Sequence, residues 1–469
     1  MMAWRRMLLR FHRTCLLPFP SSRCRAFNER AHAGGNLLGR VDGVVSKVYR
    51  TSLTGGTKND LVITHNNTIN ATTPAGLAFA PDSQPASYLK LALVNYLNSN
   101  NVKAYVTGLN ANNQLVFLGQ NGQFYYPSTS SSAPVPLADA DIAIPLGAKG
   151  STTSATIPGY LSASRVWFAD GSLKFYVVGT PNGPGLVEPA AVNPNDPNAA
   201  TNYGFAELTW IQSGGLFADI SFVDFVGLPL GIQLTTTDGT AQQQALGLPA
   251  NAVQSVCSEL QSQSQKDGQP WGDTCVYSPS GSLIRVLAPN AYLSQKNTAF
   301  SGYFDSYVQQ VFQHYSTTPL TINTQAAAGN VQCTANAGSM TITCDGDNRS
   351  YSAPSAADIF GCNSGPFAIQ GGDNAVHYAV VPRLCAAFNR GTFLLNGGNV
   401  QPSLAPSSYY TSSPANFYSE AVHKFEWNGL GYAFSYDDVS PTEQQNVAGV
   451  VASGNPGTLT LLVGGYDQA

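Results

Sequence analysis

Residues 204–232 read GFAELTWIQSGGLFADISFVDFVGLPLGI, and this stretch decides the fold. Two short runs with the composition of β-strands, 205–211 and 216–223, flank a Gln-Ser-Gly-Gly turn. Short apolar runs on either side of a glycine-rich turn predict a β-hairpin. The rest of the chain is interpreted outward from this predicted hairpin.

Three acids, Glu207, Asp219 and Asp224, interrupt this apolar stretch in a chain with only 11% charged residues. Acids are rarely buried unless they are paired or functional. Alternation along a strand places Glu207 and Thr209 on one face and Leu208 and Trp210 on the other, and this parity points Trp210 to the core. Asp224 has the opposite parity to Asp219, so both acids reach one cleft only if the second strand bulges or ends near Val223. Two converging carboxylates are the minimum for hydrolysis of a glycosidic bond, but hydrogen-bonded acids at a rim fit the same spacing.

The motifs AELTW and FADISFVDFVGLPLGI resemble the hairpin of thaumatin-like proteins and, more closely, fungal and bacterial β-1,3-glucanases of glycoside hydrolase family 64. Further matches are SASRVWFADGSLKFYVV at 162–178, PGLVEPAAVNPNDPN at 184–198 and FYSEAVHKFEWNGLGYAFSYDDV at 417–439. The resemblance runs from about residue 45 to the end of the sequence. It implies a β-1,3-glucanase of the fungal type that cuts laminarin- or curdlan-type polymers into short oligosaccharides.

The resemblance also implies roles for the hairpin acids. Glu207 matches the general acid of an inverting reaction, and Asp224 matches the general base. Inversion requires carboxyl groups about 6.5–9.5 Å apart, with a water molecule between them and the sugar. Thr209 matches a position that contacts substrate.

Five further residues are candidate substrate contacts: Asp219, Arg165, Asp437, Asp438 and Tyr436. Asp219 and Arg165 match cleft residues of thaumatin-like proteins. Asp219 would equally serve as a hydrogen-bond anchor of the hairpin, and Arg165 as an ion-pair partner of the acids. Asp437 and Asp438 belong to the matched YDDV motif, although consecutive acids at a strand end are usually turn or cap residues.

The predicted fold is mostly β: a thaumatin-like antiparallel β-sandwich or barrel with an inserted mixed α/β domain and a wide cleft between them. The predicted boundaries are 1–40 for a disordered extension, 41–234 plus 428–469 for the β-domain, and 235–427 for the insertion. Helical periodicity in the insertion predicts four helices, at 250–266, 301–315, 377–391 and 415–427.

Strand signals separated by asparagine- and glycine-rich turns fill the β-domain. The predicted strands are 61–66, 87–97, 102–109, 114–120, 123–127, 140–147, a hairpin over 162–178, 429–439 and 458–465. Within the insertion, short strands around 329–335 and 339–346 form a further predicted hairpin.

Eight cysteines divide into Cys15 and Cys24 near the start and six in the second half of the chain. Six cysteines allow fifteen connectivities, of which the simplest pairs neighbours along the chain. These pairs are Cys257–Cys275, Cys333–Cys344 and Cys362–Cys385. With no CxxC pair and six scattered histidines, a zinc site is not expected, and His377 and His423 are expected to be packed or surface residues.

The net charge of −4 gives no footprint for nucleic acid or anionic membranes, and no apolar run is long enough to span a bilayer. We therefore expect a monomer that acts on neutral β-1,3-glucan without a cofactor. The cysteines and the sequons at Asn66, Asn70 and Asn348 favour secretion. The arginine-rich residues 1–27 instead suggest a transit peptide or a misassigned start.

Two other function classes remain open at this point. A non-catalytic β-glucan-binding protein would use the same acids only to hydrogen-bond the polymer. An inhibitor or defence protein is less favoured, because the chain is long and has only six cysteines in its predicted folded part.

Overall fold

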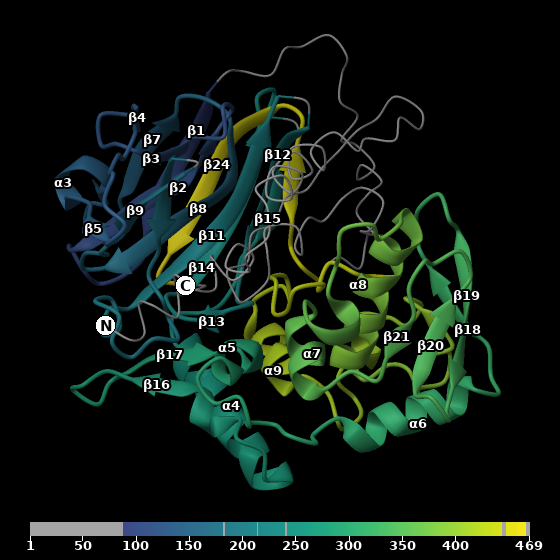
Figure 1. The fold of residues 1–469 in the computed structure, drawn as a ribbon. Helices are drawn as coiled ribbons and strands as arrows, with labels where there is room; N and C mark the ends of the chain where they lie inside the picture. Colours follow the sequence, from purple (N-terminus) through teal and green to yellow (C-terminus); the bar gives the residue numbers. More distant parts are fainter. Residues whose placement is uncertain (1–87, 182, 213, 240–241, 443–446, 466–469) are drawn as a thin grey trace. The chain divides into compact units, whose positions relative to one another are not determined.

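The computed structural model describes residues 88–181, 183–212, 214–239, 242–442 and 447–465. Over these residues the chain is mostly β, with several antiparallel sheets and seven α-helices, and the strands do not close into a barrel (Figure 1). The predicted barrel alternative is therefore wrong for this part of the chain. The predicted strand at 61–66 and the predicted extension at 1–40 lie outside the described residues.

The largest sheet has eight strands in the order β23-β12-β11-β8-β2-β3-β4, with β6 paired to β2. Its strands are β2 (Val102–Asn110), β3 (Leu115–Leu118), β4 (Phe124–Tyr125), β6 (Ile144–Pro145), β8 (Leu161–Asp170), β11 (Tyr203–Ile211), β12 (Gly215–Ile220) and β23 (Val451–Ser453). The predicted hairpin is β11 and β12, and it ends at Ile220. This early end is what the sequence required for Asp224 to approach the other acids.

A five-stranded sheet in the order β15-β14-β24-β1-β7 joins segments far apart in the sequence. Its strands are β1 (Leu89–Asn95), β7 (Thr152–Ile157), β14 (Leu230–Thr236), β15 (Gln242–Ala245) and β24 (Pro456–Val463). The last of these, β24, lies between β1, to which it is parallel, and β14, to which it is antiparallel.

Both sheets contribute to one hydrophobic core. Leu208 and Trp210 on one face of the large sheet are buried in the same cluster as Leu91 and Leu461 of the five-stranded sheet. The Trp210 ring lies 4.7 Å from that of Tyr160, so the predicted core orientation of Trp210 is confirmed. Because alternate residues point to opposite faces, Glu207 and Thr209 project from the other face of the large sheet.

Two small sheets border these strands. They have the orders β10-β9-β5 and β13-β17-β16. Their strands are β5 (Val135–Pro136), β9 (Tyr176–Thr180), β10 (Gly183–Val187), β13 (Phe225–Val226), β16 (Cys275–Tyr277) and β17 (Leu283–Leu287).

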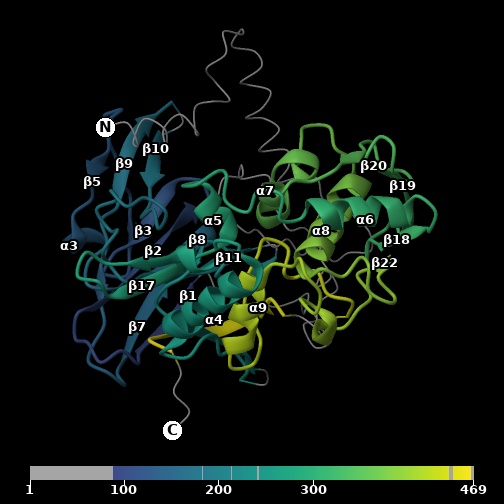
Figure 2. The same cartoon turned by 90° about the horizontal axis from the view of Figure 1, so that it is seen from below.

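The four predicted helices are present within a few residues of their predicted bounds. The described helices are α3 (Asp139–Ile142), α4 (Ala252–Asp267), α5 (Pro289–Leu293), α6 (Asp305–Tyr315), α7 (Ala356–Gly361), α8 (Ala375–Arg390) and α9 (Phe417–Phe425), with 3-10 turns at Gly272–Thr274, Gly365–Phe367 and Pro406–Ser408. Helix α8 continues through Pro382 instead of breaking there. Figures 1 and 2 show α4 beside α9, where Lys424 forms an ion pair with Glu259 at 2.8 Å.

A second five-stranded sheet and the three disulfides occupy the same half of the sequence as the long helices. The sheet has the order β21-β20-β19-β18-β22, with strands β18 (Leu320–Asn323), β19 (Asn330–Asn336), β20 (Thr341–Cys344), β21 (Tyr351–Ser352) and β22 (Val400–Gln401). The three neighbour pairings of cysteines are confirmed. Cys333 and Cys344 lie directly opposite each other on β19 and β20.

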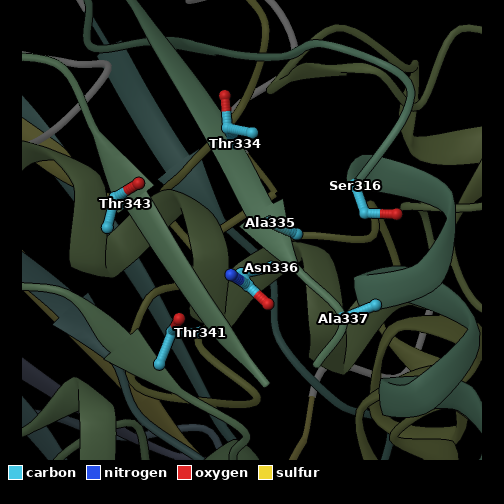
Figure 3. A pocket seen from close by; sticks show the side chains of 7 residues that line it. All are labelled: Ser316, Thr334, Ala335, Asn336, Ala337, Thr341 and Thr343. Carbon is cyan, nitrogen blue, oxygen red and sulfur yellow. The ribbon is translucent and has the colours of Figure 1, made fainter. Parts of the chain in front are cut away.

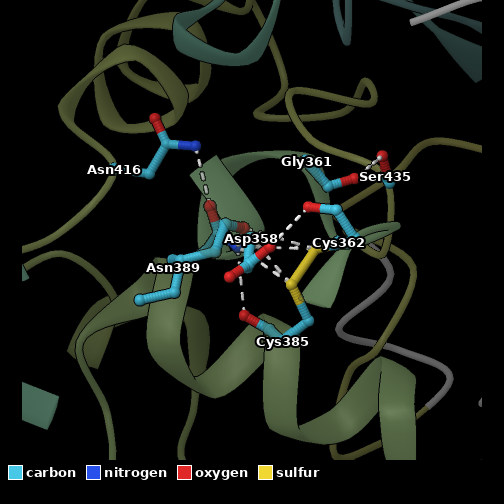
Figure 4. Close-up of a disulfide and its surroundings, with 9 residues drawn as sticks. Asp358, Gly361, Cys362, Cys385, Asn389, Asn416 and Ser435 are labelled. Carbon is cyan, nitrogen blue, oxygen red and sulfur yellow. Dashed lines mark hydrogen bonds between the residues drawn. A yellow bond between two sulfur atoms is a disulfide. The ribbon is translucent and has the colours of Figure 1, made fainter. Parts of the chain in front are cut away.

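The Cys362–Cys385 disulfide ties the end of α7 to α8 (Figure 4). Beside it, the Asn389 amide donates to the Ile359 carbonyl at 2.6 Å and accepts a hydrogen bond from Asn416 at the start of α9. The bridge therefore lies where three helices meet.

Three strand predictions need correction. Residues 140–147 contain the end of helix α3 and the two-residue strand β6, because the acids Asp139 and Asp141 in the first turn are favourable near a helix N-terminus. The 162–178 segment is not a hairpin, since β8 pairs with β2 and β11, whereas β9 joins β10 and β5. Residues 429–439 form turns with one isolated bridge instead of a strand.

No helix within the described ranges is both long and apolar enough to cross a membrane.

Candidate active site

One row of polar side chains crosses four strands of the large sheet. Glu207 on β11 pairs with Arg165 on β8 and with Asp219 on β12, and Arg165 pairs in turn with Thr107 on β2. Residues paired directly across strands share one face of a sheet. The sequence predicted three members of this row as site residues, and the strand register brings them side by side.

Arg165 is the centre of the site. Its Nε and Nη2 both donate to Oε1 of Glu207, at 3.1 and 3.0 Å. Its Nη1 donates to Glu188 at 3.2 Å, and Nη2 lies 3.9 Å from Oδ2 of Asp224. We call these four residues the Arg165 cluster. The predicted ion pair of Arg165 with the site acids is therefore present.

Two aromatic residues on the same face of the sheet, which form the next cross-strand pair along β8 and β11, hold the guanidinium in place. The Arg165 Cζ atom lies 4.1 Å from the ring centroid of Phe205 and 5.3 Å from that of Trp167. Cation–π contact of this kind attracts the guanidinium to the ring face. The Arg165 side chain is only 3% exposed, so the cation is fixed between the sheet and the carboxylates.

Asp224 is positioned by a chain segment that leaves the hairpin. The backbone at Phe222 exchanges hydrogen bonds with the Tyr432 region, and the Ala288 amide donates to the Asp224 carbonyl at 3.0 Å. Three residues further on, a Cβ atom on Gly227 would lie 2.1 Å from the Tyr203 carbonyl. Only glycine permits this close approach to β11, which keeps the Asp224 segment beside the site.

Glu188 is a member of the cluster that the sequence did not single out. It follows β10 immediately, within the matched segment at 184–198. The one sequence signal for it was an acid inside a segment that matches the family. Its contact with Arg165 joins residues 23 positions apart in the chain.

Burial and the uneven charge balance of the cluster shift its proton affinities. Burial is the main cause that raises the pKa of Glu188 to about 7; Arg165 opposes the rise, and the two other carboxylates add to it. Burial lowers the pKa of Arg165, but the three facing carboxylates outweigh it and leave that pKa above its ordinary value. The cluster therefore combines a permanent cation with a carboxyl that titrates near neutral pH.

The two predicted catalytic carboxyls lie close enough to act on one bond. Because Nη2 of Arg165 lies 3.0 Å from a Glu207 oxygen and 3.9 Å from an Asp224 oxygen, these two oxygens are at most about 7 Å apart. Carboxyl pairs of glycosidases lie about 5–5.5 Å apart in retaining enzymes and about 6.5–9.5 Å apart in inverting ones, and the upper bound here admits both. The geometry therefore allows one acid to protonate a leaving oxygen while the other acts on water or on the sugar.

Thr209 and Asp219 lie next to Glu207, one along the strand and one across it. Both are buried, with exposed fractions of 1% for Thr209 and 6% for Asp219.

Asp437 belongs to a second buried group of charges. Its carboxylate accepts hydrogen bonds from Arg390 at 3.0 Å and pairs with His423 at 2.7 Å, while His423 also pairs with Glu426 at 2.8 Å. We call Arg390, His423, Glu426 and Asp437 the Arg390 cluster. The sequence did not predict that His423 links two acids.

Charge interactions dominate the titration of this second cluster. Burial lowers the pKa of His423, but Asp437 and Glu426 outweigh it and raise the pKa to about 10. Burial raises the pKa of Asp437, but His423 and Arg390 more than offset it and leave the pKa below its ordinary value. At neutral pH the cluster thus contains a protonated histidine held between carboxylates.

The remaining candidates, Asp438 and Tyr436, are also buried, at 2% and 5% exposed. Asp438 acts electrostatically on the buried Arg383.

A cavity of about 480 Å³ lies on the second five-stranded sheet, away from the acids in sequence (Figure 3). Neutral side chains line it: Ser316, Thr334, Ala335, Asn336, Ala337, Thr341 and Thr343. Without a titratable group it offers no acid–base chemistry. In the described part of the chain, no group of three or more His, Cys, Asp or Glu side chains could hold a metal ion.

Comparisons with known proteins support this arrangement. The family model described as beta-1,3-glucanase, glycoside hydrolase family 64, matches residues 87–463. Glucan endo-1,3-beta-glucosidases from Cellulosimicrobium cellulans and from Arthrobacter sp. (strain YCWD3) are each 27% identical over 275 residues, which is 58% of this chain and 47% of theirs. The chain thus matches about half the length of these curated relatives.

Solved structures show the same fold. A laminaripentaose-producing beta-1,3-glucanase in complex with laminaritetraose is 24% identical with a TM-score of 0.70, covering 80% of this chain and 98% of its own. A beta-1,3-glucanase domain from Clostridium beijerinckii is 21% identical with a TM-score of 0.60, covering 81% and 99%. The relatives with a named organism are bacterial, so the predicted fungal type is not supported. The family match covers most of the sequence, and this chain belongs to the β-1,3-glucanases of glycoside hydrolase family 64.

Proposed function

We propose that this chain hydrolyses β-1,3-glucan to short oligosaccharides by an inverting mechanism. Glu207 is the general acid and Asp224 the general base. The observation that carries the proposal is the contact of both carboxyls with one side of the same guanidinium, that of Arg165. Family membership and the named activities of the relatives support the substrate class.

In the proposed step, Glu207 donates its proton to the glycosidic oxygen as the bond from that oxygen to the anomeric carbon breaks. Because Oε1 accepts two N–H groups of Arg165, the proton that is transferred sits on Oε2. Asp224 takes a proton from water, whose oxygen bonds to the anomeric carbon on the opposite face. Exchange of protons with solvent then restores Glu207 to the acid form and Asp224 to the carboxylate.

Neighbouring residues have supporting roles in this proposal. Thr209 and Asp219, on the same face as Glu207, hydrogen-bond sugar hydroxyls, and Arg165 orients the two catalytic carboxyls instead of contacting sugar. We assign Asp437, Asp438 and Tyr436 a structural role that supports the site, because all three are buried and Asp437 is ion-paired.

We also propose that the chain is secreted and acts as a monomer. Three disulfides favour an oxidising compartment. The chain leaves the sheets after β15 and returns with β23 and β24, which supports an insertion near residues 235–427 in a thaumatin-like β-domain. The wide cleft between the two remains part of this proposal.

The test is product analysis with a linear β-1,3-glucan, using the wild-type chain and Glu207→Gln side by side. We expect short laminari-oligosaccharides from the wild type and a rate about 10²–10⁴ times lower from the variant, the usual contribution of a general acid. Glu259→Gln, on the surface of α4, is the matched control and should keep wild-type activity.

The alternative is a β-glucan-binding protein without catalysis. Binding of the insoluble polymer with no product from the wild type would favour it. Equal rates from the wild type and Glu207→Gln would instead place the general acid on another residue.

A further inference from the structure

We propose that Glu188 is a positioning residue of this site, which fixes the orientation of Arg165 and whose charge sets the pH range in which the site is active. This inference rests on the proposed function and deepens it. Neither the spacing of the hairpin acids nor the matched motifs assigned Glu188 a role.

The first argument is geometric. A guanidinium has five N–H donors in one rigid plane, so fixing one end fixes the direction of the other donors. Glu188 accepts from Nη1, while Nε and Nη2 point to Glu207. Glu188 therefore fixes the guanidinium plane through Nη1, and the other donors of the same plane align the general acid Glu207.

The segment that carries Glu188 is itself anchored. Strand β10, which ends at Val187, is paired along its length with β9. Downstream, Arg285 donates to the carbonyls of Ala199 and Thr201 at 3.0 and 2.6 Å. Glu188 thus lies between a strand that is paired along its length and a loop that is hydrogen-bonded to Arg285. Such anchoring suits a residue that must keep another side chain in place.

The second argument is the charge count. The groups that face Glu188 are Arg165 on β8, Glu207 on β11, and Asp224 on the segment after β12. A further carboxyl, that of Asp219 on β12, lies directly across from Glu207 and adds to the negative charge on this face. One cation against three carboxylates leaves a formal charge of −2 in a buried place if every acid is ionised. Like charges this close oppose full ionisation, so the cluster retains a proton more readily than separate acids would.

The third argument is access to solvent. The Glu188 side chain is 14% exposed and that of Asp224 is 12%, against 4% for Glu207 and 3% for Arg165. Glu188 lies at the more open side of the cluster and can exchange its proton with water. Its pKa, raised by burial to about 7, agrees with a group that changes charge within the working range.

The experiment compares pH profiles of kcat/KM on linear β-1,3-glucan for the wild type, Glu188→Gln, Glu188→Asp and the surface control Glu259→Gln. Glu188→Gln keeps an oxygen for Nη1 of Arg165 but removes the negative charge. Without that charge the cluster loses its proton more easily, so we expect the alkaline limb to move to lower pH by about 1 unit. Glu188→Asp retains the charge, so its limb should return toward the wild-type position, and Glu259→Gln should match the wild type.

Each other outcome overturns the proposal in a distinguishable way. Superimposable profiles for the wild type and Glu188→Gln would show that the charge of Glu188 has no influence on the pH range of activity. A loss of activity in Glu188→Gln as large as in Glu207→Gln, with an unshifted pH profile, would give Glu188 a direct part in the chemistry instead of a positioning role. A wild-type chain that releases no product would overturn the proposed function, and with it this inference.

Discussion

The Arg165 cluster and the Arg390 cluster are both buried groups of four charges, but their charge balance differs. Arg165 alone faces Glu188, Glu207 and Asp224. In the second cluster, two cations, Arg390 and protonated His423, face two carboxylates. The Arg165 cluster thus has more carboxylates than cations, whereas the Arg390 cluster is formally neutral.

This difference in charge balance suits the Arg165 cluster to proton transfer and the Arg390 cluster to structural support. In the balanced cluster two cations offset two carboxylates, which favours the charged forms although burial raises the pKa of Glu426, and the contacts hold their segments in one arrangement. An unbalanced cluster cannot ionise fully at low energy, so it binds and releases a proton near neutral pH. The Arg390 cluster ties α8 and α9 to the 432–439 segment, and Tyr432 in that segment hydrogen-bonds the backbone beside Asp224.

The largest predicted effect on stability is that of Asp437→Asn. Removing one carboxylate leaves Arg390 and His423 with less compensation in a place where Asp437 is 0% exposed. We expect a loss of about 3–5 kcal/mol in the free energy of unfolding, measured by chemical denaturation. Glu207→Gln should cost about 1 kcal/mol or less, because two carboxylates still face Arg165.

Asp273→Asn is the control for this comparison, since the Asp273 side chain is 61% exposed and pairs with Lys296 at the surface. Equal losses for Asp437→Asn and Glu207→Gln would contradict the distinction between balanced and unbalanced clusters.

The two clusters should also respond to different pH windows. The pKa of Glu188 is raised from 4.5 to about 7, so its stabilising contribution is complete below pH 4.5 and is lost as pH rises through 7. The corresponding loss is about 3 kcal/mol at most. The pKa of His423 is raised from 6.5 to about 10, so its contribution is complete below pH 6.5 and is lost as pH rises through 10.

Melting temperature measured from pH 4 to 10 should therefore fall in two stages. Glu188→Gln should flatten the lower stage and leave the upper one, whereas His423→Gln should remove the upper stage. If either variant abolished both stages, the clusters would be coupled and the comparison would fail.

The smallest predicted effect concerns Thr209. Replacing its hydroxyl by a methyl group in Thr209→Val removes one proposed hydrogen bond to substrate, worth about 0.5–1.5 kcal/mol. We expect KM for soluble laminari-oligosaccharides to rise about 2- to 10-fold with kcat little changed. An unchanged KM would assign Thr209 to the sheet alone.

The sequence was most informative where a short-range pattern sets the geometry. The glycine-rich turn and strand alternation predicted the hairpin, the shared face of Glu207 and Thr209, and the core orientation of Trp210, because register and parity follow from local spacing. For Arg165 the sequence left both substrate contact and ion pairing with the acids open. The register of β8 with β11 places Arg165 opposite Glu207, so the ion pair forms.

The sequence was least informative where a contact depends on packing between distant segments. Glu188 follows β10, which belongs to a different sheet from the β8 strand of Arg165. Their contact therefore depends on how the two sheets pack, and no residue spacing encodes that packing. The 429–439 segment has the alternation of a strand, yet its polar groups are satisfied by α8, α9 and local turns, as in the pairing of Asp437 with His423. Tertiary partners decided both cases.

Strand β24 has a consequence for how the chain is made. It lies between β1 and β14, so this sheet stays in two parts until residues 456–463 have been synthesised. More than two hundred residues separate β24 from β14 along the chain, and loop closure over such distances makes folding slow. We expect nascent chains stalled before residue 456 to remain sensitive to protease, with the β-glucanase core closing only after β24 emerges from the ribosome.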